Sequence, residues 1–215
     1  LTHTPVIIFV NKLDREGRDP FDILDELETE LQIKVRPLSW PINIGVHFKG
    51  VYNIYEGGLD LFTPDKQKIT ERVEISDIND PIIDENIGDR DAQKLRDDIE
   101  LIEGVYPEFN VQDYLEGKVA PVFFGSALNT FGVKELLDCF VRIAPSPRPV
   151  QAVEREVKPQ EEGFSGFVFK IHANMDPNHR SCIAFVKVCS GVFQRNAPYK
   201  HVRQGKILKF AAPTA

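Results

Sequence analysis

The sequence predicts an α/β domain with an inserted α+β subdomain, followed by an all-β module. Two continuous apolar runs, residues 5–10 and 119–124, have the composition of strands that are buried on both faces. Each run is followed by a polar loop and a helical pattern, as in an α/β unit. Beyond residue 162, apolar and polar residues alternate, which is typical of half-buried strands.

The first α/β unit is predicted at residues 1–44. Its strand, residues 5–10, ends in a polar turn. Asp19 and Pro20 then mark the start of a helix, since they supply an N-cap and a proline at the first helical position. Residues 35–44 predict one extended segment, interrupted by two prolines.

The inserted subdomain is predicted at residues 45–117. Short extended pieces and Asp-rich turns precede an amphipathic helix at residues 89–103, and Gly104 is expected to end this helix. The many acidic residues between positions 60 and 103 predict a solvated acidic surface rather than a general acid–base pair.

The α/β domain is completed by residues 118–146, where a buried strand precedes a helix that stops before Pro145. Residues 147–162 are rich in proline and charge and predict a linker. Residues 163–215 predict strands separated by turns. These strands are too few to close a barrel, because small barrels need about five or more. We therefore predict a truncated β-barrel domain.

The composition fits a soluble globular protein of more than one domain. The 215 residues are 42% hydrophobic and 27% charged, which excludes disordered and collagen-like chains. The longest apolar run, residues 6–10, is far shorter than the roughly 20 residues that span a bilayer. No signal-peptide pattern is present, so we expect a cytoplasmic protein without a membrane partner. The single methionine, Met175, cannot start the chain, so an internal fragment of a longer protein is expected.

Charge is distributed unevenly along the chain. From Gly163 onward there are eight Lys or Arg and one acidic residue, a net charge of +7, against −14 for residues 1–162. Arg180, Lys187 and Arg195 are therefore candidates for contact with a nucleic-acid backbone. A charged strand face that protects open sheet edges explains the same residues equally well.

The cysteines and histidines indicate no chemistry. Three cysteines without a C-x-x-C pair favour inert thiols. The five histidines lack metal-ligand spacing. The sequence therefore predicts no catalytic residue and no metal site within this chain.

The strongest chemical signal is Asn11-Lys12-Leu13-Asp14, at the carboxyl end of the first buried strand, where ligands bind in α/β folds. This N-K-x-D pattern fits recognition of guanine. A fixed carboxylate at Asp14 can accept both N1–H and the 2-amino group, a donor pair that adenine lacks. Lys12 would lie along the base, and Asn11 would tie the loop to neighbouring backbone. A capped surface turn is the alternative for this motif alone.

A second loop, Ser126-Ala127-Leu128, follows the other buried strand and fits the S-A-[KL] pattern. Its backbone N–H would bind the guanine carbonyl while Ser126 braces the turn. Two such loops in the right order favour guanine binding over a surface turn. Asp14 and Ser126 are 112 residues apart, and the insertion fills this gap. No G-x-x-x-x-G-K-[ST] phosphate loop occurs, so we expect the phosphate and Mg²⁺ ligands upstream of Leu1.

With both loops in this order, the chain resembles translational GTPases. It resembles the C-terminal part of a P-loop-type G domain with an insertion, followed by a β-barrel second domain. Within that superfamily it is most similar to the bacterial peptide chain release factor three family. The similarity rests on four stretches, residues 36–42, 48–52, 166–180 and 184–191, which are RPLSWPI, FKGVY, GFVFKIHANMDPNHR and AFVKVCSG.

The resemblance implies binding of GDP and GTP, with Mg²⁺ in the intact protein. The base-binding residues that it implies are Asn11, Lys12, Asp14, Ser126, Ala127 and Leu128. It also implies hydrolysis of GTP on the ribosome during translation termination, which promotes departure of a class I release factor. Small-subunit RNA is the implied partner of the β-barrel domain, and DNA is not an expected partner.

Without a phosphate loop, this fragment is expected to be inactive alone. Two alternatives remain open at this point. The chain could be a fragment of another ribosomal GTPase, such as elongation factor G or a ribosomal protection protein. It could also be a non-catalytic module that docks RNA or protein.

Overall fold

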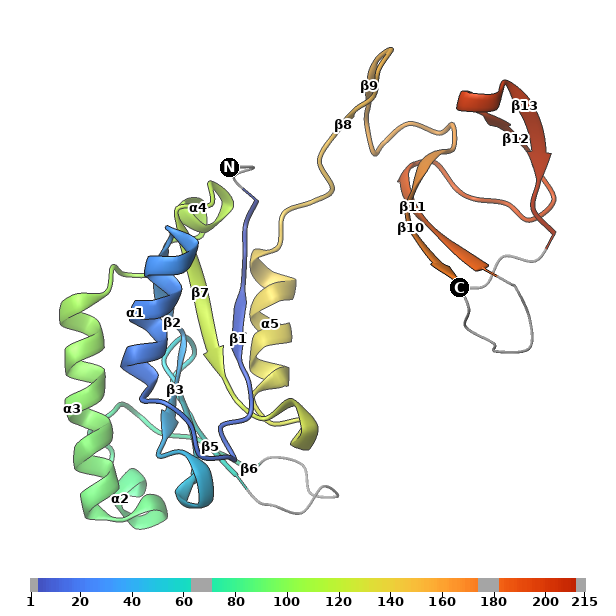
Figure 1. Cartoon of the computed structure of the whole chain (residues 1–215). Coiled ribbons are helices and arrows are strands. Elements are labelled where there is room, and N and C mark those ends of the chain that lie inside the picture. Colours follow the sequence, from blue (N-terminus) through green and yellow to red (C-terminus); the bar gives the residue numbers. More distant parts are fainter. Residues whose placement is uncertain (1–3, 63–70, 174–181, 212–215) are drawn as a thin grey trace. The chain divides into compact units, whose positions relative to one another are not determined.

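The computed structural model describes residues 4–62, 71–173 and 182–211. The chain forms two compact units, Leu1–Ala144 and Pro145–Ala215 (Figure 1). Within the described ranges, no helix combines the length and the apolar character that crossing a bilayer requires.

The first unit contains a three-stranded parallel sheet in the order β1 (Ile8–Val10), β7 (Val119–Phe124), β2 (Lys34–Pro37). All six residues of β7 are buried, which confirms the strand predicted at 119–124. The prediction of a strand buried on both faces at residues 5–10 is wrong, because β1 is shorter and only half-buried. In the described part of the chain β1 pairs with β7 alone, so it lies at an edge of the sheet.

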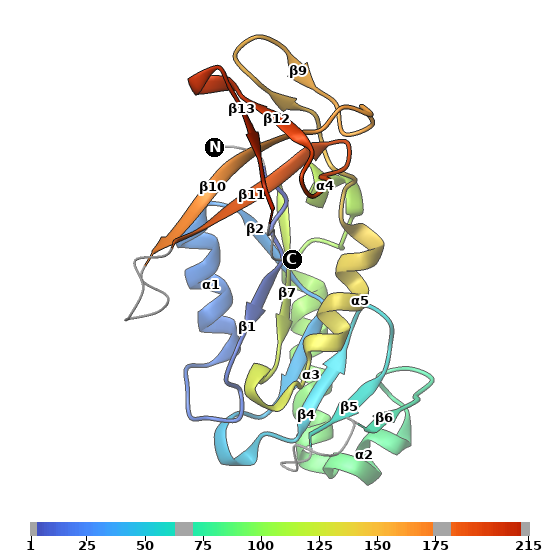
Figure 2. The same ribbon diagram turned by 90° about the vertical axis from the view of Figure 1, so that its right-hand side faces the viewer.

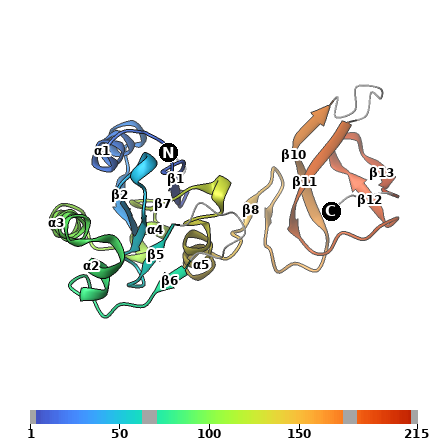
Figure 3. The same cartoon turned by 90° about the horizontal axis from the view of Figure 1, so that it is seen from below.

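Helices cover both faces of this sheet. Figure 3 shows α1 (Pro20–Leu31) and α3 (Asp89–Val105) on one side and α5 (Val133–Ile143) on the other. The predicted start of α1 is confirmed, since the side chain of Asp19 accepts a hydrogen bond from the Phe21 N–H at 2.9 Å and Pro20 follows.

The four-stranded antiparallel sheet of the first unit runs in the order β3 (Ser39–Ile42), β4 (Gly50–Asn53), β5 (Leu59–Leu61), β6 (Glu71–Val73). Figure 2 shows β4, β5 and β6 beyond the parallel sheet, close to α2 (Pro81–Ile87).

Leu38 separates the two sheets, so the single extended segment predicted at residues 35–44 is in fact two strands. The N–H of Leu38 donates to Val122 of β7 at 2.9 Å, whereas its carbonyl accepts from Ile54 at 2.9 Å and Tyr55 at 3.2 Å. The antiparallel sheet therefore begins at Ser39.

Helix α3 ends at Val105, beyond Gly104 where the sequence predicts its end. The buried guanidinium of Arg36 donates to the carbonyls of Ile102 at 3.4 Å and Tyr106 at 3.2 Å. These bonds supply a side-chain donor at the end of α3, where the last carbonyls of a helix lack intrahelical partners.

The main hydrophobic core joins the parallel sheet, the four-stranded sheet and helices α1, α2 and α3. A second cluster packs α5 and the short helix α4 (Val111–Leu115) against Phe123 of β7. Trp40 of β3 lies at the centre of the main core. Its ring centroid is 4.5 Å from that of Phe21 in α1 and 5.4 Å from that of Phe124 in β7. Its indole N–H donates to Asp98 of α3 at 3.0 Å. Trp40, which precedes the predicted insertion boundary at residue 45, is thus packed against α3, which lies inside the predicted insertion.

The second unit consists of three two-stranded antiparallel sheets in its described residues: β8 (Val150–Gln151) with β9 (Glu156–Val157), β10 (Ser165–Ala173) with β11 (Cys182–Ser190), and β12 (Pro198–His201) with β13 (Lys206–Lys209). The first of these lies within the predicted linker. An aromatic cluster of Phe164, Phe193, Tyr199 and Phe210 packs the unit, with ring centroids 4.8–6.2 Å apart. Most side chains of β10 and β11 are exposed.

Candidate functional site

The six residues predicted to bind guanine lie on two loops at one edge of the parallel sheet. Residues 11–14 follow β1, and residues 125–128 follow β7. The two strands are parallel neighbours, with Val10 paired to Phe124, so their carboxyl ends lie side by side (Figure 1). This is the edge of an α/β sheet at which ligands bind.

Three hydrogen bonds join the two loops. The Gly125 N–H donates to the Val10 carbonyl at 3.0 Å, and the Leu13 N–H donates to the Gly125 carbonyl at 3.1 Å. The Ala127 N–H donates to Oδ1 of Asn11 at 2.8 Å, and the same oxygen accepts from the Lys12 N–H at 2.8 Å. Asn11 therefore ties its own loop to the backbone of the second loop.

The first loop presents polar groups because one apolar side chain anchors it. Leu13 is buried in the core, whereas Asn11 and Lys12 are exposed and Asp14 is half-buried. Lys12 has a φ of 71°, in the left-handed region that non-glycine residues adopt at a cost. The buried leucine between three polar residues fixes the direction of the loop.

The second loop is a closed turn around Ser126. Its backbone N–H and carbonyl both bond to the backbone of Phe131, each at 3.0 Å, and its hydroxyl accepts from the Asn129 amide at 2.9 Å. Ser126 is 1% exposed, and the following 3₁₀ turn leaves Ala127 and Leu128 exposed. The brace predicted for Ser126 thus has a defined set of partners.

Two glycines allow the second loop to close. A Cβ on Gly125 would collide with the carbonyl oxygen of Phe131. Gly132 has a φ of 76°, and a Cβ there would lie 2.5 Å from the carbonyl oxygen of Phe124. Sequence reasoning missed these glycines together with Asn129 and Phe131. The glycines on either side of the S-A-L motif are the signal that could have revealed them.

The site offers an acceptor at Asp14, a lysine stem at Lys12 and a backbone donor at Ala127. An exposed planar ligand with adjacent N–H donors and a carbonyl matches this set. A carbonyl that binds here would share the Ala127 N–H with Asn11. Three-centre bonds of this kind are common at helix termini, and Ala127 begins a 3₁₀ helix.

The structure describes two of the three candidate nucleic-acid contacts of the second unit. Lys187 is exposed on β11, opposite Phe167 of β10. Arg195 is exposed, and its Nε donates to the carbonyl of Ala211. Arg180 lies outside the described residues.

No group of three or more His, Cys, Asp or Glu is arranged to hold a metal ion in the ranges that the structure covers.

Two family models match this chain. Residues 1–146 match the elongation factor Tu GTP binding domain, and residues 163–215 match elongation factor G domain 2. A crystal structure of a protein from Thermus thermophilus is similar in fold, with a TM-score of 0.59 and 18% sequence identity. The similarity covers 96% of this chain and 30% of that chain.

Proposed function

The chain belongs to the translational GTPases through its elongation factor Tu GTP-binding domain, and from this premise we propose that residues 11–14 and 126–128 bind the guanine base of GDP and GTP. The hydrogen bond between Ala127 and Asn11 carries the proposal, because it holds the two loops in one fixed arrangement. A base held between the two loops would contact hydrogen-bond donors and acceptors of both loops.

Asp14 discriminates between bases in this proposal. Its carboxylate accepts N1–H and the 2-amino group of guanine together. Adenine offers no such pair and would leave the carboxylate without partners. Lys12 lays its alkyl stem along the base, Ser126 braces the second loop, and the Ala127–Leu128 turn presents its N–H to the base carbonyl.

Titration of fluorescent GDP with the purified chain tests this. Saturable binding that GDP but not ADP displaces supports guanine recognition by these loops. Absence of saturation up to millimolar protein would overturn binding by this chain. Asp14→Asn should weaken this binding, whereas the matched control Asp97→Asn, which removes an exposed carboxylate of α3, should leave it unchanged.

We further propose that the protein containing this chain acts in translation termination, hydrolysing GTP on the ribosome and promoting departure of a class I release factor. The four stretches quoted above support this, one of which crosses the junction of β2 and β3. The chain spans only 30% of the length of the solved relative. We therefore propose GTP hydrolysis and Mg²⁺ binding for the whole protein and not for this chain alone. Lys187 and Arg195, with Arg180, are proposed to contact small-subunit RNA.

A role like that of elongation factor G is the second candidate, favoured by the match of residues 163–215. Post-termination ribosomes that carry a labelled class I factor distinguish the two. Faster loss of the label on addition of the GTP-loaded protein supports the termination role. Movement of tRNA and messenger without loss of the label supports the alternative.

A further inference from the structure

A cleft of about 740 Å³ lies in the first unit, lined by the start of α1, by β3 and the segment that follows it, and by the N-terminal half of α3. Apolar side chains form part of its lining, among them Phe21, Pro41 and Ile44. Cavities of this size are typical of sites that bind a ligand. None of the six residues proposed to bind guanine is among the described residues that line it.

The lining of the cleft carries more acidic than basic side chains. Two acids come from the segment before α1 and three from α3, namely Glu16, Asp19, Asp89, Asp91 and Asp98. The bases are Lys49, Arg90 and Lys94, and the acids remain in excess even when His47 is counted with the bases. This charge favours a cationic ligand over an anionic one.

Two of the three bases are already engaged by acids of the same lining. Lys49 pairs with Asp91 at 2.6 Å and also donates to the carbonyl of Ile87 at 2.5 Å. Its hydrogen bond holds the pKa of Asp91 below the usual range, so this carboxylate is charged. Lys94 pairs with Asp98 at 2.6 Å. Little positive charge is therefore left to bind an anion.

The fold positions an acid on each side of the cleft. A Cβ on Gly45, which has a φ of 66°, would collide with the carboxylate of Glu16, so this carboxylate lies against the backbone of Gly45. The Gly45 N–H donates to the carbonyl of Leu13 at 2.9 Å. Asp98 accepts from the indole N–H of Trp40 at 3.0 Å. Groups that are already held in place lose less conformational freedom when a ligand binds.

We propose that this cleft binds a basic peptide segment of a partner protein, with arginine or lysine side chains at the carboxylates and an apolar side chain against Phe21, Pro41 and Ile44. The acidic excess selects a basic segment over an acidic one. The apolar part of the lining selects a peptide over a polyamine, which has charge but no apolar side chain. Binding here does not depend on guanine binding at the other two loops.

The fluorescence of Trp40 tests the proposal, because Trp40 is the only tryptophan of the chain and lines the cleft. The acetylated and amidated peptide RLRLR is titrated into the purified chain, and ELELE and spermine serve as comparison probes. We expect a saturable change with RLRLR, none with ELELE and clearly weaker binding of spermine.

Three results would overturn the proposal. The first is the absence of saturation with RLRLR up to millimolar peptide. The second is equal affinity for ELELE or spermine, which would indicate an unselective surface or a polyamine site. The third is self-association of the chain that RLRLR reverses, which would identify a second copy as the occupant.

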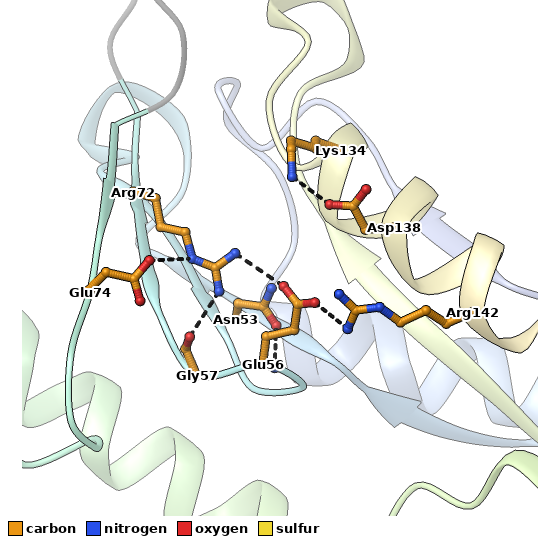
Figure 4. Close-up of polar contacts among 8 residues, drawn as sticks. All are labelled: Asn53, Glu56, Gly57, Arg72, Glu74, Lys134, Asp138 and Arg142. Atoms are coloured by element: carbon orange, nitrogen blue, oxygen red, sulfur yellow. Dashed lines mark hydrogen bonds and ion pairs between the residues drawn. The ribbon is translucent and has the colours of Figure 1, made fainter.

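Asp98→Asn tests the role of one carboxylate, because asparagine can still accept from the indole of Trp40. The matched control is Asp138→Asn, which removes the acid of a similar i,i+4 pair. Lys134 and Asp138 lie 2.5 Å apart on α5 (Figure 4), and neither lines the cleft.

Asp98→Asn should weaken RLRLR binding about two- to fivefold, the contribution of one ion pair that water can reach. Asp138→Asn should leave the affinity unchanged. Equal losses in the two variants, or no loss in Asp98→Asn, would overturn the proposal. Glu16→Gln, at an exposed position, gives the same measurement if Asp98→Asn cannot be purified folded.

Discussion

Asn11 and Ala127, which are 116 residues apart in sequence, are joined by a hydrogen bond of 2.8 Å from the backbone N–H of Ala127 to Oδ1 of Asn11. The bond connects the loops that follow two neighbouring parallel strands. Its acceptor is a side chain, so a substitution can remove it without altering either backbone.

Asn11→Ala should therefore weaken guanine nucleotide binding at least tenfold while lowering the free energy of unfolding by only about 1 kcal/mol, the net contribution of an exposed hydrogen bond. GDP titration and urea denaturation measure the two effects. Asn86→Ala, which removes an exposed asparagine from α2, should leave binding unchanged. Full affinity in Asn11→Ala would refute a role for the tether.

In the intact protein, Asp14→Asn should weaken GDP binding and shift the nucleotide preference toward xanthine nucleotides. Xanthine replaces the 2-amino donor with a carbonyl, which an amide N–H can bind. Competition between GDP and XDP for the same site measures the change. Retention of the wild-type preference would mean that Asp14 does not read the base.

Gly132→Ala should destabilise the first unit by about 1–3 kcal/mol, because Gly132 has a positive φ and its Cβ would meet the Phe124 carbonyl. Gly104→Ala is a control of opposite sign. Gly104 lies inside α3 with open space around its missing Cβ, so alanine should stabilise the helix by about 0.5–1 kcal/mol. If the denaturant midpoints of the two variants shifted in the same direction from that of the wild type, this prediction would be contradicted.

Glu56→Gln should cost more stability than Glu74→Gln. Glu56 accepts from both Arg72 and Arg142 and its side chain is 18% exposed, whereas that of Glu74 is 85% exposed and 3.6 Å from Arg72. Loss of the shared carboxylate should cost about 1–3 kcal/mol, and loss of the exposed pair about 0–1 kcal/mol. Salt titration of the unfolding free energy separates the two, since screening acts mainly on the exposed pair.

Local sequence patterns predicted correctly those elements whose composition and capping residues are contiguous in the sequence. The apolar run of β7 and the Asp19–Pro20 start of α1 were both predicted and are both present. The two loops were located because the N-K-x-D and S-A-L patterns each follow a predicted strand. The neighbourhood of Asn11 and Ala127 follows from that placement.

Tertiary contacts explain what the sequence could not reveal. Gly104 does not end α3, and Arg36, a distant residue, binds one carbonyl on either side of it, those of Ile102 and Tyr106. The acidic residues between positions 60 and 103 were predicted to form a solvated surface, yet Asp60 in β5 is buried. No local periodicity distinguishes this buried acid from its exposed neighbours.

Leu38 limits how this chain can change in length. Its N–H belongs to one sheet and its carbonyl to the other, so no spare residue lies between β2 and β3. One added residue here would turn every following side chain of β3 to the opposite face, and Trp40 would lose its contacts with Phe21 and Phe124. Length variation among relatives should therefore be absent at this junction and be found in the turns between the later strands of the four-stranded sheet.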